Sequence, residues 1–181
     1  CFTAAAVVPF FVFALRRGAV LSDRHERVRS AMLDAATAVV DAHGAEVLRE
    51  LIAQLEMSLD ADNDAVTEAA VVLLGRAARH LAPEDAHVRR VVDRLLDALR
   101  TPSELVQEAV AACLPPLVRT AAVHGDVPAI VDQLFAELLH GASYAARRGA
   151  AYGLAGVVAG CGVDSIRARR ILPRLADAID D

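Results

Sequence analysis

Apolar residues recur along this chain at intervals of forty positions, in two registers that lie four residues apart. The first register consists of Phe11, Leu51, Val91, Val131 and Ile171. The second consists of Leu15, Leu55, Leu95, Phe135 and Leu175. Residues four apart lie on one face of an α-helix, so each pair marks a buried stripe. The pattern therefore predicts one kind of helix, repeated five times.

A second helix is predicted after each of the first four. These segments begin at an apolar or small residue, with spacings of 38, 40 and 40: Val28, Val66, Val106 and Ala146. From Val66 to Leu81 the apolar spacing alternates between three and one, which is typical of a buried helical face. The residue three positions after each of these is small, which predicts close approach of helix backbones. These small residues are Ala31, Ala69, Ala109 and Gly149.

Turn signals agree with this pairing. The candidate N-caps of the second helices are Ser22 or Asp23, Asp62 or Asn63, Ser103, and Ser143. Three glycines are expected to close second helices: Gly44, Gly125 and Gly162. Pro83 is expected to open a first helix, where proline is tolerated. Pro115 and Pro116 fall inside a second helix and are expected to kink it.

A two-helix unit of about forty residues is the period of HEAT repeats, whereas the armadillo unit has three helices. We therefore expect an all-α fold, an alpha-alpha superhelix of about four and a half HEAT repeats in one array over residues 1–181. The expected repeats cover residues 1–43, 44–82, 83–124, 125–162 and, in part, 163–181. The first helix and the partial last repeat lack polar caps, so we expect the array to be a fragment of a longer solenoid.

The apolar start of the chain allows two interpretations. Its first fifteen residues are shorter than the roughly 20 that span a bilayer, and Pro9 interrupts them before Arg16 and Arg17 end the run. A signal-peptide core is one interpretation of this segment. We favour the other, a core helix of the solenoid.

Composition agrees with a helical scaffold. Apolar residues make up 55% of the chain and aromatic residues only 4%, so its apolar content is mostly Ala, Leu and Val, of which Ala and Leu form helices well. The net charge of −5 argues against general binding of nucleic acid but leaves room for a local basic patch. All 19 basic residues are arginine, which can bind carboxylate or phosphate through two parallel hydrogen bonds.

Spacings that would support catalysis or metal binding are missing from the sequence. The six histidines show neither HxxxH nor HExxH, and the glycine-rich run at 149–162 lacks the Gly-Lys-Ser/Thr of a phosphate loop. Cys1, Cys113 and Cys161 form no CxxC, and the last two lie on apolar stripes, as structural thiols do. We therefore predict no enzyme, no cofactor, no metal and no small-molecule substrate.

Clustered arginines are the candidate contact residues. The candidates for contact with a ribosome or another partner are Arg147, Arg148, Arg167, Arg169 and Arg170. One interpretation is a solvated helix face with ion pairs. The other is a ridge of guanidinium groups that binds RNA phosphate or an acidic partner.

Four strings are more specific than a general HEAT pattern. They are AVVDAHG at 38–44, AVVLLGRAARHL at 70–81, TPSELVQEAVAACLPPLV at 101–118 and SYAARRGAAYGLAGVVAG at 143–160. Together they resemble the general-control translational activator family, which consists of very large eukaryotic HEAT-repeat proteins. The resemblance covers roughly residues 20–181 and is to the central part of that family, which is similar to the HEAT region of fungal elongation factor three.

The resemblance implies a cytoplasmic, non-enzymatic scaffold on translating or stalled ribosomes. It implies an ATP-binding-cassette partner, and a role in activating the kinase that phosphorylates the alpha subunit of initiation factor two during amino-acid starvation. The family's kinase-binding segment lies elsewhere, so this chain is not expected to bind the kinase. We expect no membrane partner either. The alternative is a generic HEAT adaptor of the transport-receptor or phosphatase-scaffold type. The ribosome hypothesis predicts co-facing arginines, and the adaptor hypothesis predicts an apolar or acidic groove.

Overall fold

The computed structural model describes residues 3–16, 19–85, 87–168 and 173–174. Its α-helices are α1 (Ala4–Ala14), α2 (Glu26–His43), α3 (Leu48–Ser58), α4 (Asp64–Ala77), α5 (His87–Ala98), α6 (Glu104–Val123), α7 (Val127–His140) and α8 (Tyr144–Ala168). Three short 3-10 segments are η1 (Val20–Ser22), η2 (Gly44–Val47) and η3 (Ala78–His80). These ranges contain no β-strand, as the predicted all-α fold requires.

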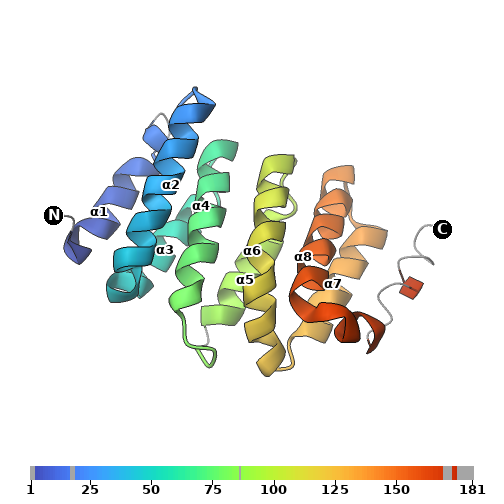
Figure 1. Ribbon diagram of the computed structural model, residues 1–181. Coiled ribbons are helices and arrows are strands. Elements are labelled where there is room, and N and C mark those ends of the chain that lie inside the picture. The colour runs from blue at the N-terminus through green and yellow to red at the C-terminus, as the bar shows by residue number, and fades with distance from the viewer. Residues whose placement is uncertain (1–2, 17–18, 86, 169–172, 175–181) are drawn as a thin grey trace.

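The helices form two layers. Figure 1 shows α2, α4, α6 and α8 side by side, with α3, α5 and α7 behind them. In the first layer α2 contacts α4, α4 contacts α6, and α6 contacts α8. Each helix of the second layer packs on the helix that follows it in the chain: α3 on α4, α5 on α6 and α7 on α8. This arrangement is the stacked helix pair of a HEAT-type solenoid.

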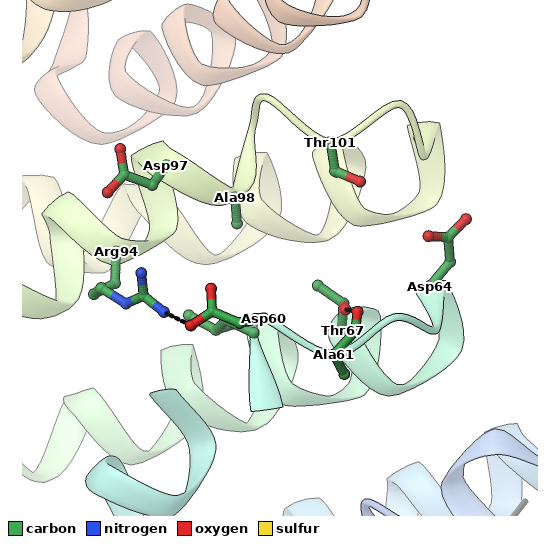
Figure 2. Close-up of a pocket in the computed structure, with 9 residues that line it drawn as sticks. Asp60, Ala61, Asp64, Thr67, Arg94, Asp97, Ala98 and Thr101 are labelled. Carbon is green, nitrogen blue, oxygen red and sulfur yellow. Dashed lines mark hydrogen bonds and ion pairs between the residues drawn. The ribbon is translucent and has the colours of Figure 1, made fainter. Parts of the chain in front are cut away.

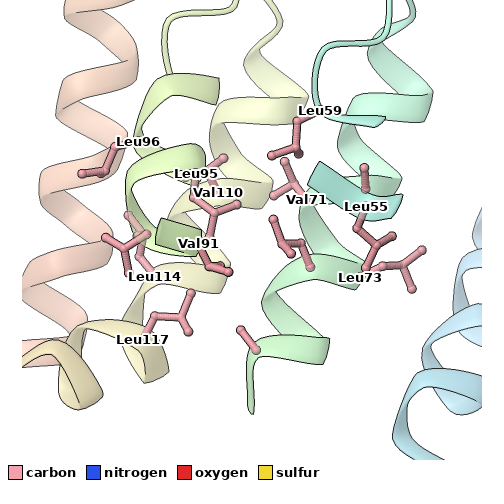
Figure 3. Packing of buried hydrophobic residues seen from close by; sticks show 14 of the residues in the cluster. Leu55, Leu59, Val71, Leu73, Val91, Leu95, Leu96, Val110, Leu114 and Leu117 are labelled. Atoms are coloured by element: carbon pink, nitrogen blue, oxygen red, sulfur yellow. The ribbon is translucent and has the colours of Figure 1, made fainter. Parts of the chain in front are cut away.

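The core lies between the layers and contains the two predicted registers. Their eight described members are each at most 8% exposed: Phe11, Leu15, Leu51, Leu55, Val91, Leu95, Val131 and Phe135. Figure 3 shows Leu55, Val91 and Leu95 of the first helices beside Leu73 and Leu114 of the second ones. The registers are therefore confirmed there, while Ile171 and Leu175 lie outside the described residues.

The predicted stripe of the second helices holds in α4 and fails at the head of α2. Every residue of the alternating set from Val66 to Leu81 is at most 9% exposed. Val28 occupies the same repeat position as Val66 but is 39% exposed, and Ala31 is exposed as well. Among the helices that the structure describes, α2 has a neighbour in its layer on one side only, α4, so the first turn of α2 is less covered.

Asn63, Ser103 and Ser143 stand at the predicted N-caps, and two of them cap through the side chain, while Ser103 makes no side-chain capping bond. The Asn63 side chain accepts the Val66 N–H at 3.1 Å, and Ser143 Oγ accepts the Ala146 N–H at 3.1 Å. For α2 the prediction is wrong, because the N-cap is His25. Asp23 Oδ1 instead accepts the His25 N–H at 2.8 Å, and this local turn delays the helix start.

Glycine and proline follow the predictions in part. Gly125 follows the end of α6 with a φ of 76°, the left-handed conformation that stops a helix. Gly162 has a φ of 74° and a ψ of 169°, and it interrupts α8, which continues beyond it to Ala168. Gly44 ends α2 in a right-handed conformation, so the chain continues directly into η2. Pro83 does not open a helix, since it precedes α5 by four residues.

Two further features bear on the interpretation of helices α6 and α1. Pro115 and Pro116 lie inside α6, and the predicted kink stays a prediction. Phe11 of α1 is fully buried, and α1 packs on α3, as the core-helix interpretation requires. None of the helices in the described part of the chain is both long enough and apolar enough to cross a bilayer.

Candidate functional site

The turn inside each helix pair is held by a side chain from the following helix. In each of the four pairs that side chain donates a hydrogen bond to the carbonyl six residues earlier. The bonds are Arg29 to Asp23 at 2.8 Å, Thr67 to Ala61 at 3.3 Å, Gln107 to Thr101 at 2.8 Å and Arg147 to Gly141 at 2.8 Å. A turn carbonyl that would otherwise need water is satisfied this way. We call these four residues the turn latches.

Gln107 is the turn latch with the most bonds. It is 0% exposed, and its Nε2 lies within 2.8 to 2.9 Å of the carbonyl oxygens of Leu99, Thr101 and Ala145. Its two N–H groups are therefore shared among three acceptors, one of which belongs to the next helix pair. Gln107 Oε1 accepts from Arg148 Nε at 2.8 Å. This buried amide joins α6 to the start of α8.

Arg148, one of the predicted contact residues, is bonded within the chain. Besides Gln107, its guanidinium donates to the Pro102 carbonyl at 2.8 Å and forms an ion pair with Glu104 at 3.4 Å. The guanidinium carbon lies 5.8 Å from the centre of the Tyr144 ring. Only 24% of the side chain is exposed. Its position fits a link between helix pairs, because most of its donors already have acceptors.

The structure describes the side chain of only one of the other four predicted contact residues, Arg147. Arg147 is exposed, although one of its N–H groups bonds Gly141 in the turn latch. Arg167 lies in α8, but its side chain is outside the described part, as are Arg169 and Arg170 altogether. The structure brings Arg147 and Arg148 to the start of α8, and a shared surface of all five arginines stays a prediction.

Several other arginines pair with carboxylates of the neighbouring helix pair. The pairs are Arg76–Asp41, Arg89–Asp126, Arg90–Glu56, Arg94–Asp60, Arg100–Glu137 and Arg174–Asp132. The Arg76 guanidinium lowers the pKa of the Asp41 carboxyl, mainly through a hydrogen bond. Five of these pairs join partly exposed side chains and add little to stability, whereas the Glu56 side chain is only 7% exposed. None of these six arginines is among the predicted contact residues, for which both interpretations stay predictions.

Tyr152 on α8 extends the contact between α8 and α6. Its hydroxyl donates to Glu104 at 2.7 Å and lies 3.2 Å from Glu108. The hydrogen bond to Glu104 is the main reason that the pKa of Tyr152 rises to about 12, because deprotonation would place an anion beside two carboxylates. The hydroxyl therefore stays a donor over the whole neutral range.

An acidic hollow lies between two of the turns. It has a volume of about 230 Å³ and lies between the α3–α4 turn and the end of α5. Figure 2 shows Asp60, Asp64 and Asp97 around it, with Arg94 bonded to Asp60 at 2.7 Å. Within the described residues, no group of three or more His, Cys, Asp or Glu side chains is placed to hold a metal ion.

Cys113 is placed for packing rather than for nucleophilic attack. A Cβ added to Gly75 of α4 would come within 2.6 Å of Cys113 Sγ, so the missing side chain makes room for the sulfur. Burial raises the pKa of the Cys113 thiol to about 11. The thiolate, which is the reactive form, is therefore scarce at neutral pH.

We expect Cys113 to react slowly with iodoacetamide at pH 8. A pKa of about 11 instead of 9.0 lowers the thiolate fraction about a hundredfold, and the rate should fall by at least that factor. The measurement is mass-spectrometric labelling of a Cys1→Ser/Cys161→Ser variant, with the denatured protein as control. Equal rates in the native and denatured protein would contradict this placement.

Three glycines of α8 lie against α6 or against the turn that precedes it. A Cβ on Gly149 would meet the Leu99 carbonyl oxygen far inside van der Waals contact, and one on Gly160 would come within 2.8 Å of the Pro115 oxygen. On Gly156 it would come within 2.7 Å of the Ala111 oxygen. Small residues at these positions let the two backbones approach closely. The predicted close approach is confirmed at Gly149, and the glycine-rich run is a packing face.

Comparison with known proteins gives the family. Residues 1–79 match the family described as "Stalled ribosome sensor GCN1, HEAT repeats". The human "Stalled ribosome sensor GCN1" is 44% identical to the chain over 180 residues, which is 97% of the chain. The chain belongs to the GCN1 family. This is the family that the four strings of the sequence resemble.

Other members of the GCN1 family are similar over the same length. The "eIF-2-alpha kinase activator GCN1" of Saccharomyces cerevisiae is 35% identical over 163 residues, 89% of the chain. The protein of the same name from Dictyostelium discoideum is 32% identical over 179 residues, 94% of the chain. The chain spans only 6–7% of the length of these relatives. No solved structure matches the chain.

The two most specific of the GCN1-like strings face each other in the fold. The string at 101–118 supplies Gln107 and the Pro102 carbonyl, and the string at 143–160 supplies Arg148 and Gly149. Their residues form the junction between α6 and α8. Sequence reasoning missed this role, because nothing local indicates that Gln107 and Arg148 are partners forty-one residues apart.

Proposed function

We propose that this chain is a scaffold segment of a ribosome-associated translational activator. In this proposal it helps to switch on the kinase that phosphorylates the alpha subunit of initiation factor two during amino-acid starvation or ribosome stalling. The supporting observation is the 44% identity, over 97% of the chain, to a protein named as a sensor of stalled ribosomes. A two-layer helical solenoid with latched turns suits this role, since it presents a long surface of fixed shape.

The finer parts of the proposal concern partners and place of action. We infer a cytoplasmic protein without catalytic activity that contacts the ribosome, through protein or ribosomal RNA, and an ATP-binding-cassette partner. The kinase is engaged through other parts of the full-length protein. These inferences come from the family resemblance and from the names of relatives, which read "stalled ribosome sensor" and "eIF-2-alpha kinase activator".

Among the candidate contact residues, Arg147 is the best placed of those whose side chains the structure describes. It is exposed at the start of α8, and one N–H bond to Gly141 leaves most of its guanidinium free to meet a phosphate. We propose Arg167, Arg169 and Arg170 as further contacts on the sequence pattern alone. Arg148 is proposed mainly as the residue that holds the base of this surface.

Reversing the charge of these arginines should weaken ribosome binding. We expect the combined change of Arg147, Arg167, Arg169 and Arg170 to Glu to lower cosedimentation with purified ribosomes at least tenfold at low salt, since phosphate contacts depend on charge. Arg49→Glu, on an exposed residue of α3, is the matched control. Arg147→Lys keeps the charge and should retain most of the binding. Undiminished cosedimentation of the charge-reversed variant would remove these residues from the interface.

One observation favours the second candidate function, a generic HEAT adaptor for a protein partner. Arg148 is bonded inside the chain, and a largely apolar hollow, whose charged lining residues are Glu26, Arg29 and Glu68, lies between α2, α4 and α6. Such a groove is what the adaptor hypothesis predicts. The two functions are compatible, because the hollow and the start of α8 lie on different helix pairs.

A further inference from the structure

The surface of helices α4 and α6 is divided by charge along the length of each helix. Four carboxylates lie in the first two turns of these helices: Asp64, Glu68, Glu104 and Glu108. Beyond them, residues 69–80 and 109–124 contain no Asp or Glu. The charged residues of these two stretches are all arginine: Arg76, Arg79 and Arg119. The carboxyl-terminal ends of α4 and α6 are therefore basic.

Arg79 and Arg119 have the same repeat position, forty residues apart, on helices that pack side by side (Figure 1). Both residues are exposed, and neither side chain forms a hydrogen bond or an ion pair with the residues that the structure describes. An arginine at a helix end offsets the helix dipole, but this leaves its guanidinium donors without acceptors in the protein. Packed helices lie about 8–10 Å apart, so the two guanidinium groups have about that spacing. We call these two residues the arginine pair.

The charge of Arg79 acts on the helices on both sides of α4. In α2 the pKa of Asp41 is lowered mainly by the hydrogen bond from Arg76, and to a smaller extent by the Arg79 charge. In α6 burial raises the pKa of Cys113, and the Arg79 charge opposes this increase. Both carboxylate oxygens of Asp41 already accept hydrogen bonds from Arg76. Asp41 therefore leaves the hydrogen-bond donors of Arg79 unused.

The acidic loop residues at this end of the solenoid lie on another side of α6. Glu84, Asp85 and Asp126 line a hollow of about 240 Å³ together with His124. His124 comes five residues after Arg119, which turns the two side chains about 140° apart around the helix axis. None of the three acids forms an ion pair with Arg119. The arginine pair therefore faces solvent without a carboxylate partner from these loops.

Apolar side chains flank Arg119 on the surface of α6. Val123, four residues later, is 71% exposed, and Pro116, three residues earlier, is half-buried. Residues three and four apart are neighbours on a helix surface, so both lie next to the guanidinium. A single exposed valine is common, but this one adjoins a cation that has no partner. The surface thus offers an apolar contact beside a charged one.

We propose that the carboxyl-terminal ends of α4 and α6 bind an acidic helix of another protein, which places carboxylates on Arg79 and Arg119 and an apolar side chain against Val123. Charge complementarity selects the carboxylates, and each guanidinium can bind one through two parallel hydrogen bonds. Residues seven apart share one face of a helix at a separation of about 10.5 Å, which is close to the spacing of the arginine pair.

An RNA strand fits this surface less well than an acidic helix does. RNA carries a negative charge at every nucleotide, and the four carboxylates of α4 and α6 begin about 16 Å away along the same helix faces. A protein helix with a few separate carboxylates avoids that repulsion. The proposal is independent of the ribosome-contact proposal, which concerns α8.

The test uses a phage-displayed library of random sixteen-residue peptides, selected on the full chain. The selected peptides are then synthesised, and their affinity is measured by fluorescence anisotropy. We expect them to carry Asp or Glu at positions seven apart, with Leu, Ile, Met or Phe three or four residues from one of these acids. Their affinity should fall about tenfold or more for the Arg79→Gln/Arg119→Gln variant and about threefold for Val123→Ser.

A matched control separates this site from general attraction by charge. Arg24→Gln/Arg49→Gln removes two other exposed arginines that have no ion pair among the described residues, and it should leave the affinity unchanged. Arg79→Lys/Arg119→Lys keeps the charge but loses the planar fork, so its affinity should lie between those of the native chain and the glutamine variant. Thermal melts recorded by circular dichroism check that every variant is folded.

Four outcomes would overturn the proposal. The first is that no peptide is selected, and the second is that the selected peptides lack paired acids. The third is that Arg79→Gln/Arg119→Gln binds the peptides as tightly as the native chain, or that the Arg24→Gln/Arg49→Gln control loses as much affinity. The fourth is displacement of the peptides by an equal concentration of a twenty-nucleotide RNA, which would make the site one for nucleic acid.

Discussion

Replacing Gly149 with alanine is expected to lower the free energy of unfolding by about 3 kcal/mol, at the upper end of what overpacking a well-packed site costs. The added Cβ would overlap the Leu99 carbonyl oxygen and would come within 2.9 Å of Gln107 Nε2. Both groups belong to the buried hydrogen-bond cluster, so α8 has to move away from α6. The measurement is chemical denaturation followed by circular dichroism.

Gly125→Ala is the matched control for this substitution. Gly125 has a φ of 76°, but a Cβ there would meet nothing within 4 Å. Its cost is therefore only that of the left-handed backbone conformation, about 1 kcal/mol. If Gly149→Ala and Gly125→Ala unfold at the same denaturant concentration, close packing of α8 on α6 is not what Gly149 provides.

Replacing Gln107 with leucine should cost about 3 kcal/mol of stability, because each buried polar group left unpaired costs about 1–3 kcal/mol. The change nearly conserves volume and removes the donor to the carbonyls of Leu99, Thr101 and Ala145. It also removes the acceptor of the Arg148 Nε–H group. The measurement is again the free energy of unfolding, with the slope of the transition as a check on two-state behaviour.

The control for Gln107 is the equivalent turn latch of the preceding helix pair. Thr67→Val removes a hydroxyl whose two bonds, both 3.3 Å long, stay within its own helix pair, so we expect a loss of about 1 kcal/mol. A double-mutant cycle of Gln107→Leu with Arg148→Met should give a coupling of about 1–3 kcal/mol, since the two side chains share a bond. Additive effects would mean that Arg148 does not act through Gln107.

The turn latches explain why their positions carry no recognisable motif. Arginine, threonine and glutamine all serve, because the requirement is only a side-chain donor that reaches back to a carbonyl six residues earlier. In Arg147 the latch uses part of a guanidinium that the sequence analysis had grouped with the contact arginines. In a solenoid, arginines that bond within the chain therefore have to be separated from arginines that do not before a cluster is assigned to a binding surface.

The sequence by itself determined the helices and the core. Helical periodicity and turn chemistry act within a few residues, so the forty-residue registers, the Asn63 and Ser143 caps and the stop at Gly125 were all predictable. The exceptions are informative. Asp23 was a candidate cap, but its side chain bonds His25 and delays α2. Val28 has an apolar side chain at a core position that too few neighbours cover.

Only the tertiary structure decided how the charged and amide side chains are used. Arg148 meets Gln107 and Glu104 because α8 stacks on α6. Partners of this kind lie about forty residues apart in sequence, and their contact depends on the angle and distance between helix pairs. Those are set by packing of the glycine face of α8 and of the core, which no local signal describes.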